Sequence, residues 1–234
     1  MQLENIKMAI VLRSGYIMMI KETWRKKLNI KQMKKLLMLL MMLGTCISVF
    51  AQDQLVKDID FDGKKDTIYI DQKEWKIVCR LSTQNFKKLK SKQIETSGDN
   101  SYIKATRNGF EILVNWMRAG YACQFRYEKV EKRIRLIGIT EYAFGNAAND
   151  GSGEASANLL TGDYIGNWHY FDHLANNEKG ELVKIPTIKT KLKFKKIYLE
   201  EFNEESYFAY STQLEGLVEQ HKTAEKNRRA KKTH

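Results

Sequence analysis

The chain has 234 residues, with 40 Lys and Arg against 28 Asp and Glu and a formal net charge of +12. Nine of these basic residues precede Gln52, and residues 221–234 carry six more with a single Glu. Residues 52–220 are therefore close to neutral, which removes the electrostatic support for nucleic-acid binding. No nucleic acid partner is expected, and residues 221–234 are interpreted as a solubilising basic tail.

Residues 33–51 have the pattern of a secretory signal peptide: two lysines, an apolar run and small residues before Gln52. Gly44 interrupts the run, which is shorter than the roughly 17 apolar residues of a membrane span. Cleavage between Ala51 and Gln52 is therefore favoured over a retained transmembrane anchor, and we expect export to the periplasm, the cell surface or the medium. Residues 1–32 are interpreted as a non-native extension, because a signal peptide rarely follows so long a segment.

The mature part of the chain is long enough for one domain with a sizeable core, assigned to residues 52–220. It keeps two cysteines, Cys79 and Cys123. An even pair in an exported protein is compatible with one disulfide. Both cysteines lie in strand-like runs, so two buried small apolar side chains explain them equally well. A monomer is expected.

Alternation of apolar and polar residues with period two dominates this domain and predicts β-strands. Gly138 indicates a β-bulge within its strand. Pro186 indicates that its strand lies at an edge or is broken there. The predicted strands cover residues 67–70, 75–82, 109–117, 121–127, 133–139, 155–162, 182–189 and 191–199.

The period changes to that of a helix near the end of the chain. Asn203 is placed to cap the N-terminus, and apolar residues then recur at helical spacing from Tyr207 to Val218. Basic residues up to Arg229 suit the C-terminal end of the helix dipole. The predicted fold is mainly β: an antiparallel curved sheet or barrel-like domain of about eight strands with one C-terminal α-helix.

The stretch DIDFDGKKD places four aspartates within nine residues. Calcium requires several hard oxygen ligands, which alternate residues of a tight loop supply. Gly63 permits the sharp turn. The sequence therefore predicts a Ca²⁺ site in a loop that runs directly into a strand. Its predicted ligands are the side chains of Asp58, Asp60, Asp62 and Asp66 and the backbone carbonyl of Lys64.

This loop resembles the calcium loops of FG-GAP and VCBS-type repeats, in which an Asp-x-Asp/Asn-x-Asp-Gly-x-x-Asp segment leads into an apolar strand. The resemblance covers about thirteen residues, occurs once, and does not imply the propeller of those families. Position twelve of the loop is Tyr69, where an EF-hand has a bidentate Glu. The alternative is an acidic hairpin turn, because Asp-Gly is a common turn dipeptide.

A second segment, residues 125–162, is similar to small bacterial exported proteins. The similarity lies in Phe-Arg-Tyr at 125–127, Leu-Ile-Gly at 136–138 and the segment 156–162. Some relatives with one such calcium loop resemble periplasmic immunity proteins that inhibit lysozyme-like hydrolases. The resemblance implies a β architecture and an inhibitory role. The polar loop 145–154 is the candidate contact surface.

No catalytic motif accompanies these features. His169 and His173 have a spacing compatible with a metal pair, but a zinc site needs a third ligand and a nearby general base. They are interpreted as residues of an exposed aromatic-rich loop. We expect a non-enzymatic, exported Ca²⁺-binding β domain that presents a surface to a protein or glycan partner. The alternatives are an inhibitor or immunity protein against a cell-wall hydrolase, and a hydrolase with an unrecognised site.

Overall fold

The structure of the chain is a computed structural model that describes residues 54–94 and 101–231. All of these belong to one compact unit, Gln52–His234. The predicted N-terminal extension and signal peptide, residues 1–51, lie outside the described residues. None of the helices in the described part of the chain combines the length and the apolar character that a membrane span requires.

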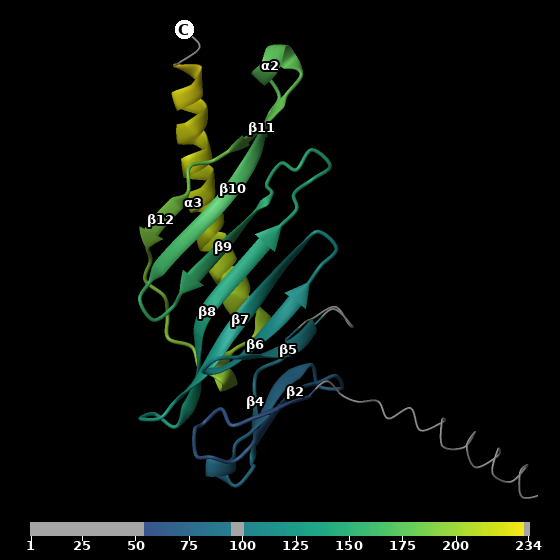
Figure 1. Cartoon of the computed structure of the whole chain (residues 1–234), viewed down its shortest axis with the longest axis vertical. Helices are drawn as coiled ribbons and strands as arrows, with labels where there is room; N and C mark the ends of the chain where they lie inside the picture. Colours follow the sequence, from purple (N-terminus) through teal and green to yellow (C-terminus); the bar gives the residue numbers. More distant parts are fainter. Residues whose placement is uncertain (1–53, 95–100, 232–234) are drawn as a thin grey trace, which may run out of the picture. The chain divides into compact units, whose positions relative to one another are not determined.

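The first four strands form a small antiparallel sheet in the order β1-β2-β3-β4 (Figure 1). In β2, alternate residues are buried, as expected for a strand with one face against the core. A short 3₁₀ helix, η1 (Ser82–Gln84), follows β3. The strands are β1 (Gln54–Lys57), β2 (Asp66–Asp71), β3 (Lys76–Arg80) and β4 (Lys88–Lys90).

The remaining strands of the described ranges form a larger antiparallel sheet in the order β11-β10-β9-β8-β7-β6-β5, with β12 also paired to β10. Short turns connect β5 to β6, β6 to β7, β7 to β8 and β9 to β10, and a longer loop connects β8 to β9, so neighbours in sequence are neighbours in space. These strands are β5 (Ser101–Thr106), β6 (Gly109–Asn115), β7 (Ala119–Glu128), β8 (Arg133–Ala143), β9 (Gly153–Asn158), β10 (Asp163–Asp172), β11 (Glu181–Lys184) and β12 (Ile188–Lys191).

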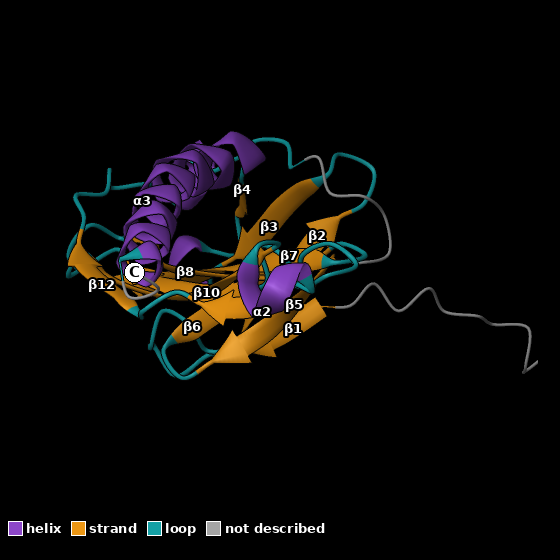
Figure 2. Cartoon of the chain, turned by 90° about the horizontal axis from the view of Figure 1, so that it is seen from above, coloured by secondary structure: helices purple, strands orange, loops and turns teal. Residues whose placement is uncertain are grey.

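Helix α3 (Glu204–Ala230) lies across one face of the large sheet (Figure 2). Asn203 begins it as predicted: its N–H donates to Ser206 Oγ at 3.4 Å, and this hydroxyl donates to Asn203 Oδ1 at 2.9 Å. The helix includes most of the predicted basic tail, up to Ala230. Two shorter helical elements, α2 (Ala175–Glu178) and η3 (Leu199–Glu201), lie in the connections before it.

A β-bulge interrupts the pairing of β7 with β8, as Gly138 predicted. Gln124 faces Gly138, whereas the next residue, Phe125, faces Leu136, so Ile137 is the extra residue. The bulge shifts by one position the alternation of core-facing and outward-facing residues along β8. Glu141 therefore lies on the same face as Ile139, beneath helix α3, rather than on the opposite face.

The strand predicted over 182–189 is broken at Pro186, and its two halves both pair with β10, along the same edge of that strand. The strand predicted over 191–199 is wrong beyond Lys191. That segment pairs with its neighbours only at separate points: Leu192 N–H donates to the Gly162 carbonyl, Leu136 N–H donates to the Ile197 carbonyl, and Tyr198 forms an isolated bridge with Arg135. Its apolar residues alternate because they pack on the core, not because they belong to a ladder.

The main core joins the inner face of the large sheet to α3 and to the small sheet. Phe125 is fully buried, stacks on Phe110 and meets Phe202 edge-on. The mainly β class, the antiparallel sheets and the single long C-terminal helix confirm the predicted fold class. The strands of residues 54–94 and 101–231 are divided between two sheets, and neither sheet closes into a barrel.

Candidate metal centre and clefts beside the helix

The predicted calcium loop connects β1 to β2. Two of its residues, Phe61 (φ 64°) and Gly63 (φ 88°), have left-handed backbone conformations. Glycine adopts this conformation without steric cost, as the predicted sharp turn requires. Asp58 stabilises the turn: its two carboxylate oxygens accept the N–H groups of Phe61 and Gly63 at 2.7 and 3.0 Å.

Asp66, the first residue of β2, is fully buried and holds three backbone segments together. Its Oδ2 accepts the N–H groups of Ile59 at 2.8 Å and Asp60 at 3.3 Å. Its Oδ1 accepts the N–H of Ser82 at 2.8 Å, from the start of η1. The carboxylate thus connects the loop to a segment sixteen residues further along the chain.

Asp60 is 3% exposed, and its two oxygens have different surroundings. Oδ2 accepts the hydroxyl of Thr83 at 2.6 Å and the N–H of the same residue at 3.3 Å. Oδ1 is buried and has no hydrogen-bond partner among the described residues. An unpaired buried carboxylate oxygen is costly, so this atom indicates a missing positive partner.

Asp58, Asp60 and Asp66 each offer a carboxylate oxygen within 4.8 Å of those of the other two. They form the only cluster of three or more His, Cys, Asp or Glu with metal-ligating spacing in the described residues. Carboxylate oxygens are hard ligands suited to hard cations such as Ca²⁺ and Mg²⁺. The donor set therefore fits a divalent cation, and Asp60, whose Oδ1 has no hydrogen-bond partner in the described part of the chain, is one of its three residues.

The other two predicted ligands are placed differently. Asp62 is exposed and outside the cluster, and its Oδ1 accepts the N–H of Lys64 at 2.8 Å. This hydrogen bond is the main cause that lowers the pKa of Asp62 below its usual value. The structure thus brings together three of the four predicted carboxylates. The carbonyl of Lys64 as a ligand stays a prediction.

Cys79 and Cys123 are free thiols. Cys79 pairs with Ile68 in the small sheet, whereas Cys123 pairs with Ile139 in the large sheet, and both are fully buried. The disulfide alternative is therefore not present in this structure, and the cysteines serve as small apolar core residues. Burial raises the pKa of both thiols, so neither is a reactive thiolate.

The two histidines belong to different environments. His169 lies within β10, half-buried, with Nδ1 at 3.3 Å from the Ser152 carbonyl oxygen. This corrects the interpretation of His169 as a loop residue. His173 is exposed after the strand and meets the ring of Phe171 edge-on at 4.9 Å.

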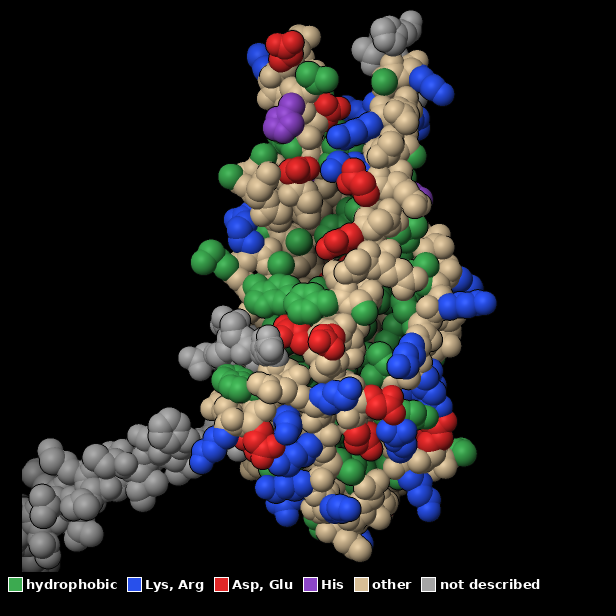
Figure 3. Space-filling view, turned by 180° about the vertical axis from the view of Figure 1, so that it is seen from behind, with side chains coloured by type: hydrophobic (Ala, Val, Ile, Leu, Met, Phe, Trp, Pro, Cys, Tyr) green, Lys and Arg blue, Asp and Glu red, His purple; other side chains and the backbone are tan. Residues whose placement is uncertain are grey.

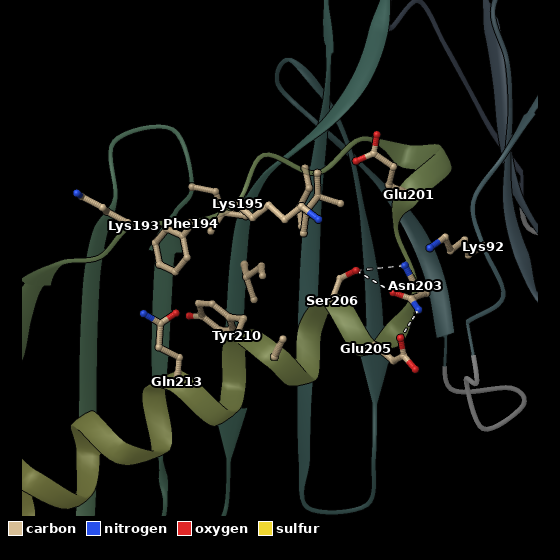
Figure 4. Close-up of a pocket in the computed structure, with 15 residues that line it drawn as sticks. Lys92, Lys193, Phe194, Lys195, Glu201, Asn203, Glu205, Ser206, Tyr210 and Gln213 are labelled. Carbon is tan, nitrogen blue, oxygen red and sulfur yellow. Dashed lines mark hydrogen bonds between the residues drawn. The ribbon is translucent and has the colours of Figure 1, made fainter.

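Two clefts lie along helix α3. The first, about 550 Å³, is named the lysine-rimmed cleft and lies near the N-terminal half of the helix (Figure 4). Phe194 and Tyr210 face one another there, with ring centroids 5.8 Å apart. Three lysines and two glutamates line this cleft, so its charges nearly balance. It is lined by Lys92, Leu136, Ile139, Leu159, Lys193, Phe194, Lys195, Ile197, Glu201, Asn203, Glu205, Ser206, Ala209, Tyr210 and Gln213.

The second cleft, about 420 Å³, is named the acidic cleft because Asp and Glu side chains outnumber basic ones in its lining. It contains Glu141, which sequence reasoning missed. The available signal was the bulge at Gly138, which changes the face on which Glu141 lies. The space-filling view of Figure 3 shows hydrophobic side chains alongside the long helix with acidic side chains among them.

Comparison with known proteins finds no match among family models, curated proteins or solved structures.

Proposed function

We propose that this chain is an exported, non-enzymatic β domain in which the Asp58–Asp66 loop binds Ca²⁺ and the large sheet with α3 presents a binding surface to a protein or glycan partner. The observation that carries the metal part is the buried Oδ1 of Asp60. It has no hydrogen-bond partner among the described residues, and Asp60 is one of a cluster of three carboxylates. A divalent cation supplies the positive charge that this atom lacks.

Calcium is preferred over other divalent ions because of the donor chemistry. Only carboxylate oxygens meet in the cluster, with no histidine or cysteine. Zinc and copper favour nitrogen and sulfur ligands. Magnesium demands a nearly ideal octahedron, whereas calcium accepts irregular oxygen shells of six to eight ligands. A loop that turns through two left-handed residues supplies such an irregular shell.

The role of the ion in this proposal is structural. Asp58 and Asp60 belong to the loop, Asp66 begins β2, and Asp60 and Asp66 also accept hydrogen bonds from η1. A cation bound to all three carboxylates cross-links these segments. An extracellular site of this kind fills even when its Kd is about 10⁻⁴–10⁻³ M. The predicted signal peptide, which lies outside the described residues, supports such a location.

Support for a binding surface comes from the C-terminal end of β8 and from the loop that follows it. The candidate contact loop 145–154 is held in place: Arg118 donates hydrogen bonds to the carbonyls of Gly145 and Asn146 at 2.6 and 3.0 Å. Asp150 Oδ1 accepts the N–H of Phe171 at 2.8 Å. A pre-organised loop loses little conformational freedom when a partner binds.

Exposed apolar side chains surround the same region. Met117 is 94% exposed, and Phe208 stacks on Trp116 with ring centroids 6.5 Å apart. Phe144 is also exposed, and its N–H donates to the Arg118 carbonyl at 2.8 Å. Large exposed apolar groups next to an ordered polar loop are typical of protein-interaction surfaces.

Calcium titration of the purified protein tests the metal proposal. Calorimetry and thermal melting are carried out with EDTA, with Ca²⁺ and with Mg²⁺. With Kd near 1 mM, 10 mM Ca²⁺ stabilises the fold by about 1.4 kcal/mol, which raises Tm by roughly 3–6 °C for a domain of this size. Mg²⁺ should have a smaller effect.

Asp60→Asn removes one ligand charge while keeping the side-chain shape, and should abolish the calcium-dependent rise in Tm. The matched control is Asp163→Asn, an exposed aspartate paired with Lys191 and outside the cluster. This control should keep the full calcium response. Identical melting of the unmodified protein in EDTA and in 10 mM Ca²⁺, with no heat of binding, would overturn the proposal.

A further inference from the structure

The acidic cleft contains a carboxylate that no basic residue balances. Glu141 lies on the helix-facing side of β8, and Glu215 lines the same cleft from α3. Among the described residues, no Lys or Arg forms an ion pair with either glutamate, whereas Lys222 in the same lining is paired with Glu219 at 3.2 Å. Burial raises the pKa of Glu141 to about 7, and Glu215 adds to this rise. A cation entering the cleft supplies the missing opposite charge.

Aromatic side chains form the walls of the same cleft. Trp168, Tyr142 and Tyr207 line it. The indole N–H of Trp168 donates to the Tyr164 hydroxyl at 3.1 Å, and the Tyr142 hydroxyl donates to Asn115 Oδ1 at 2.9 Å, so both rings are fixed in orientation. The faces of aromatic rings attract cations, most strongly those of tryptophan.

A volume of about 420 Å³ suits a small ligand or one long side chain rather than an extended polymer. Apolar groups also line the cleft, including Ile185 and Val218. These groups favour a ligand with a hydrocarbon stem behind its charged end. Carboxylate, aromatic and aliphatic groups in one cleft are the complement of an alkyl- or aryl-ammonium ion.

We propose that the acidic cleft binds a primary ammonium group on an apolar stem, with Glu141 as its main anionic contact and Trp168 as its aromatic wall. This chemistry is that of a lysine side chain on a protein partner or of a free amine. The inference rests on the proposed function in one respect only: it assumes that the domain binds a partner. It does not depend on the calcium site. The metal cluster contributes no residue to the cleft.

The test measures binding of benzylamine and of N-acetyl-lysine methylamide to the calcium-saturated protein, by calorimetry and by NMR shifts of the Trp168 indole N–H. Benzyl alcohol and benzoate are the neutral and anionic comparisons. We expect benzylamine to bind at least tenfold more tightly than benzyl alcohol, and benzoate not to bind. Binding of the capped lysine assigns the cleft to a partner's side chain, whereas binding of benzylamine alone assigns it to a free amine.

Glu141→Gln keeps the shape of the side chain and should weaken benzylamine binding at least tenfold. Glu178→Gln, an exposed residue of α2 outside the cleft, is the matched control and should leave the affinity unchanged. A melting curve of the Glu141→Gln protein verifies that it is folded. Equal affinity for benzylamine and benzyl alcohol, or an unchanged affinity in Glu141→Gln, would overturn the inference.

The same titration on Asp60→Asn separates this inference from the metal proposal. Benzylamine affinity should be unchanged in that variant, because Asp60 is not part of the cleft. Amine binding without any calcium response refutes only the metal site. A calcium response without amine binding refutes only the assignment of the cleft.

Discussion

The hydroxyl of Tyr207 on helix α3 donates a hydrogen bond to Oε2 of Glu141 on strand β8, across 3.3 Å. Burial raises the pKa of this carboxyl group to about 7, while the hydrogen bond from Tyr207 lowers it and Glu215 raises it further. The helix therefore covers a group that is only partly ionised at neutral pH. We therefore expect the packing of α3 on the sheet to depend on pH.

The first prediction concerns stability as a function of pH. Because the pKa of Glu141 is raised from 4.5 to about 7, the folded state retains a proton that the unfolded chain releases over this range. This group therefore destabilises the fold as pH rises from about 4.5 to 7. Glu141→Gln should be more stable than the unmodified protein by about 1–3 kcal/mol at pH 8, with no significant difference at pH 4.

Urea denaturation of both proteins from pH 4 to pH 8 measures this difference. The other groups that face Glu141 are Tyr207, Tyr210 and Glu215 from α3 and Tyr164 from β10. They are the same in both proteins, so the difference isolates Glu141. A difference that does not depend on pH would contradict the raised pKa.

The second prediction concerns Asp66 without any metal. Asp66→Ala removes an acceptor for three backbone N–H groups at a fully buried position. Each buried donor left unpaired costs about 1–3 kcal/mol, so the loss of unfolding free energy should be at least about 3 kcal/mol. Urea denaturation in EDTA measures it.

Asp62→Ala is the control in the same loop, because Asp62 is exposed and accepts one N–H group. Its effect in EDTA should stay within about 1 kcal/mol. Similar losses for the two variants would mean that Asp66 does not hold the loop to η1.

The third prediction concerns the cysteines. Both thiols are fully buried and free, and burial raises the pKa of each. Iodoacetamide should therefore modify Cys79 and Cys123 only after unfolding, as measured by peptide mass spectrometry. A reducing agent should not change Tm. A peptide in which Cys79 is linked to Cys123 would contradict this expectation.

The fourth prediction concerns the start of α3. Asn203→Ala removes the side-chain oxygen that accepts the Ser206 hydroxyl at 2.9 Å. Loss of such a helix cap costs about 1 kcal/mol, measured by urea denaturation. Gln213→Ala, within the same helix, is the comparison and should change stability by less than about 0.5 kcal/mol. Equal losses of unfolding free energy in Asn203→Ala and Gln213→Ala would show that the helix cap does not stabilise the fold.

The fold class followed from local patterns, because apolar residues recur at every second, buried position of β2, β6 and β7. Strand β10 was missed. Its inward-facing residues are Tyr164, Gly166, Trp168 and Tyr170, and glycine and partly polar aromatic residues give a weak hydrophobic alternation. The strand is nevertheless central, because β9 and both β11 and β12 pair with it.

The candidate metal site was likewise predicted only in part from the sequence. The spacing of the aspartates predicted the loop, and Asp58, Asp60 and Asp66 do meet. The unpaired oxygen of Asp60 was beyond sequence reasoning, because it depends on Thr83, which is 23 residues away along the chain. Glu141 was missed for a related reason: the bulge, not the local pattern, decides which face it occupies.

The interruption at Pro186 has a consequence for self-association. It divides one edge of the large sheet into two strands of four residues each, and proline has no backbone N–H to offer a neighbouring chain. Lys184, Lys189 and Lys191 are exposed along these two strands. Short lysine-bearing edges are poor templates for an incoming strand from another molecule. At this edge, we expect the domain to resist sheet-to-sheet aggregation at high concentration.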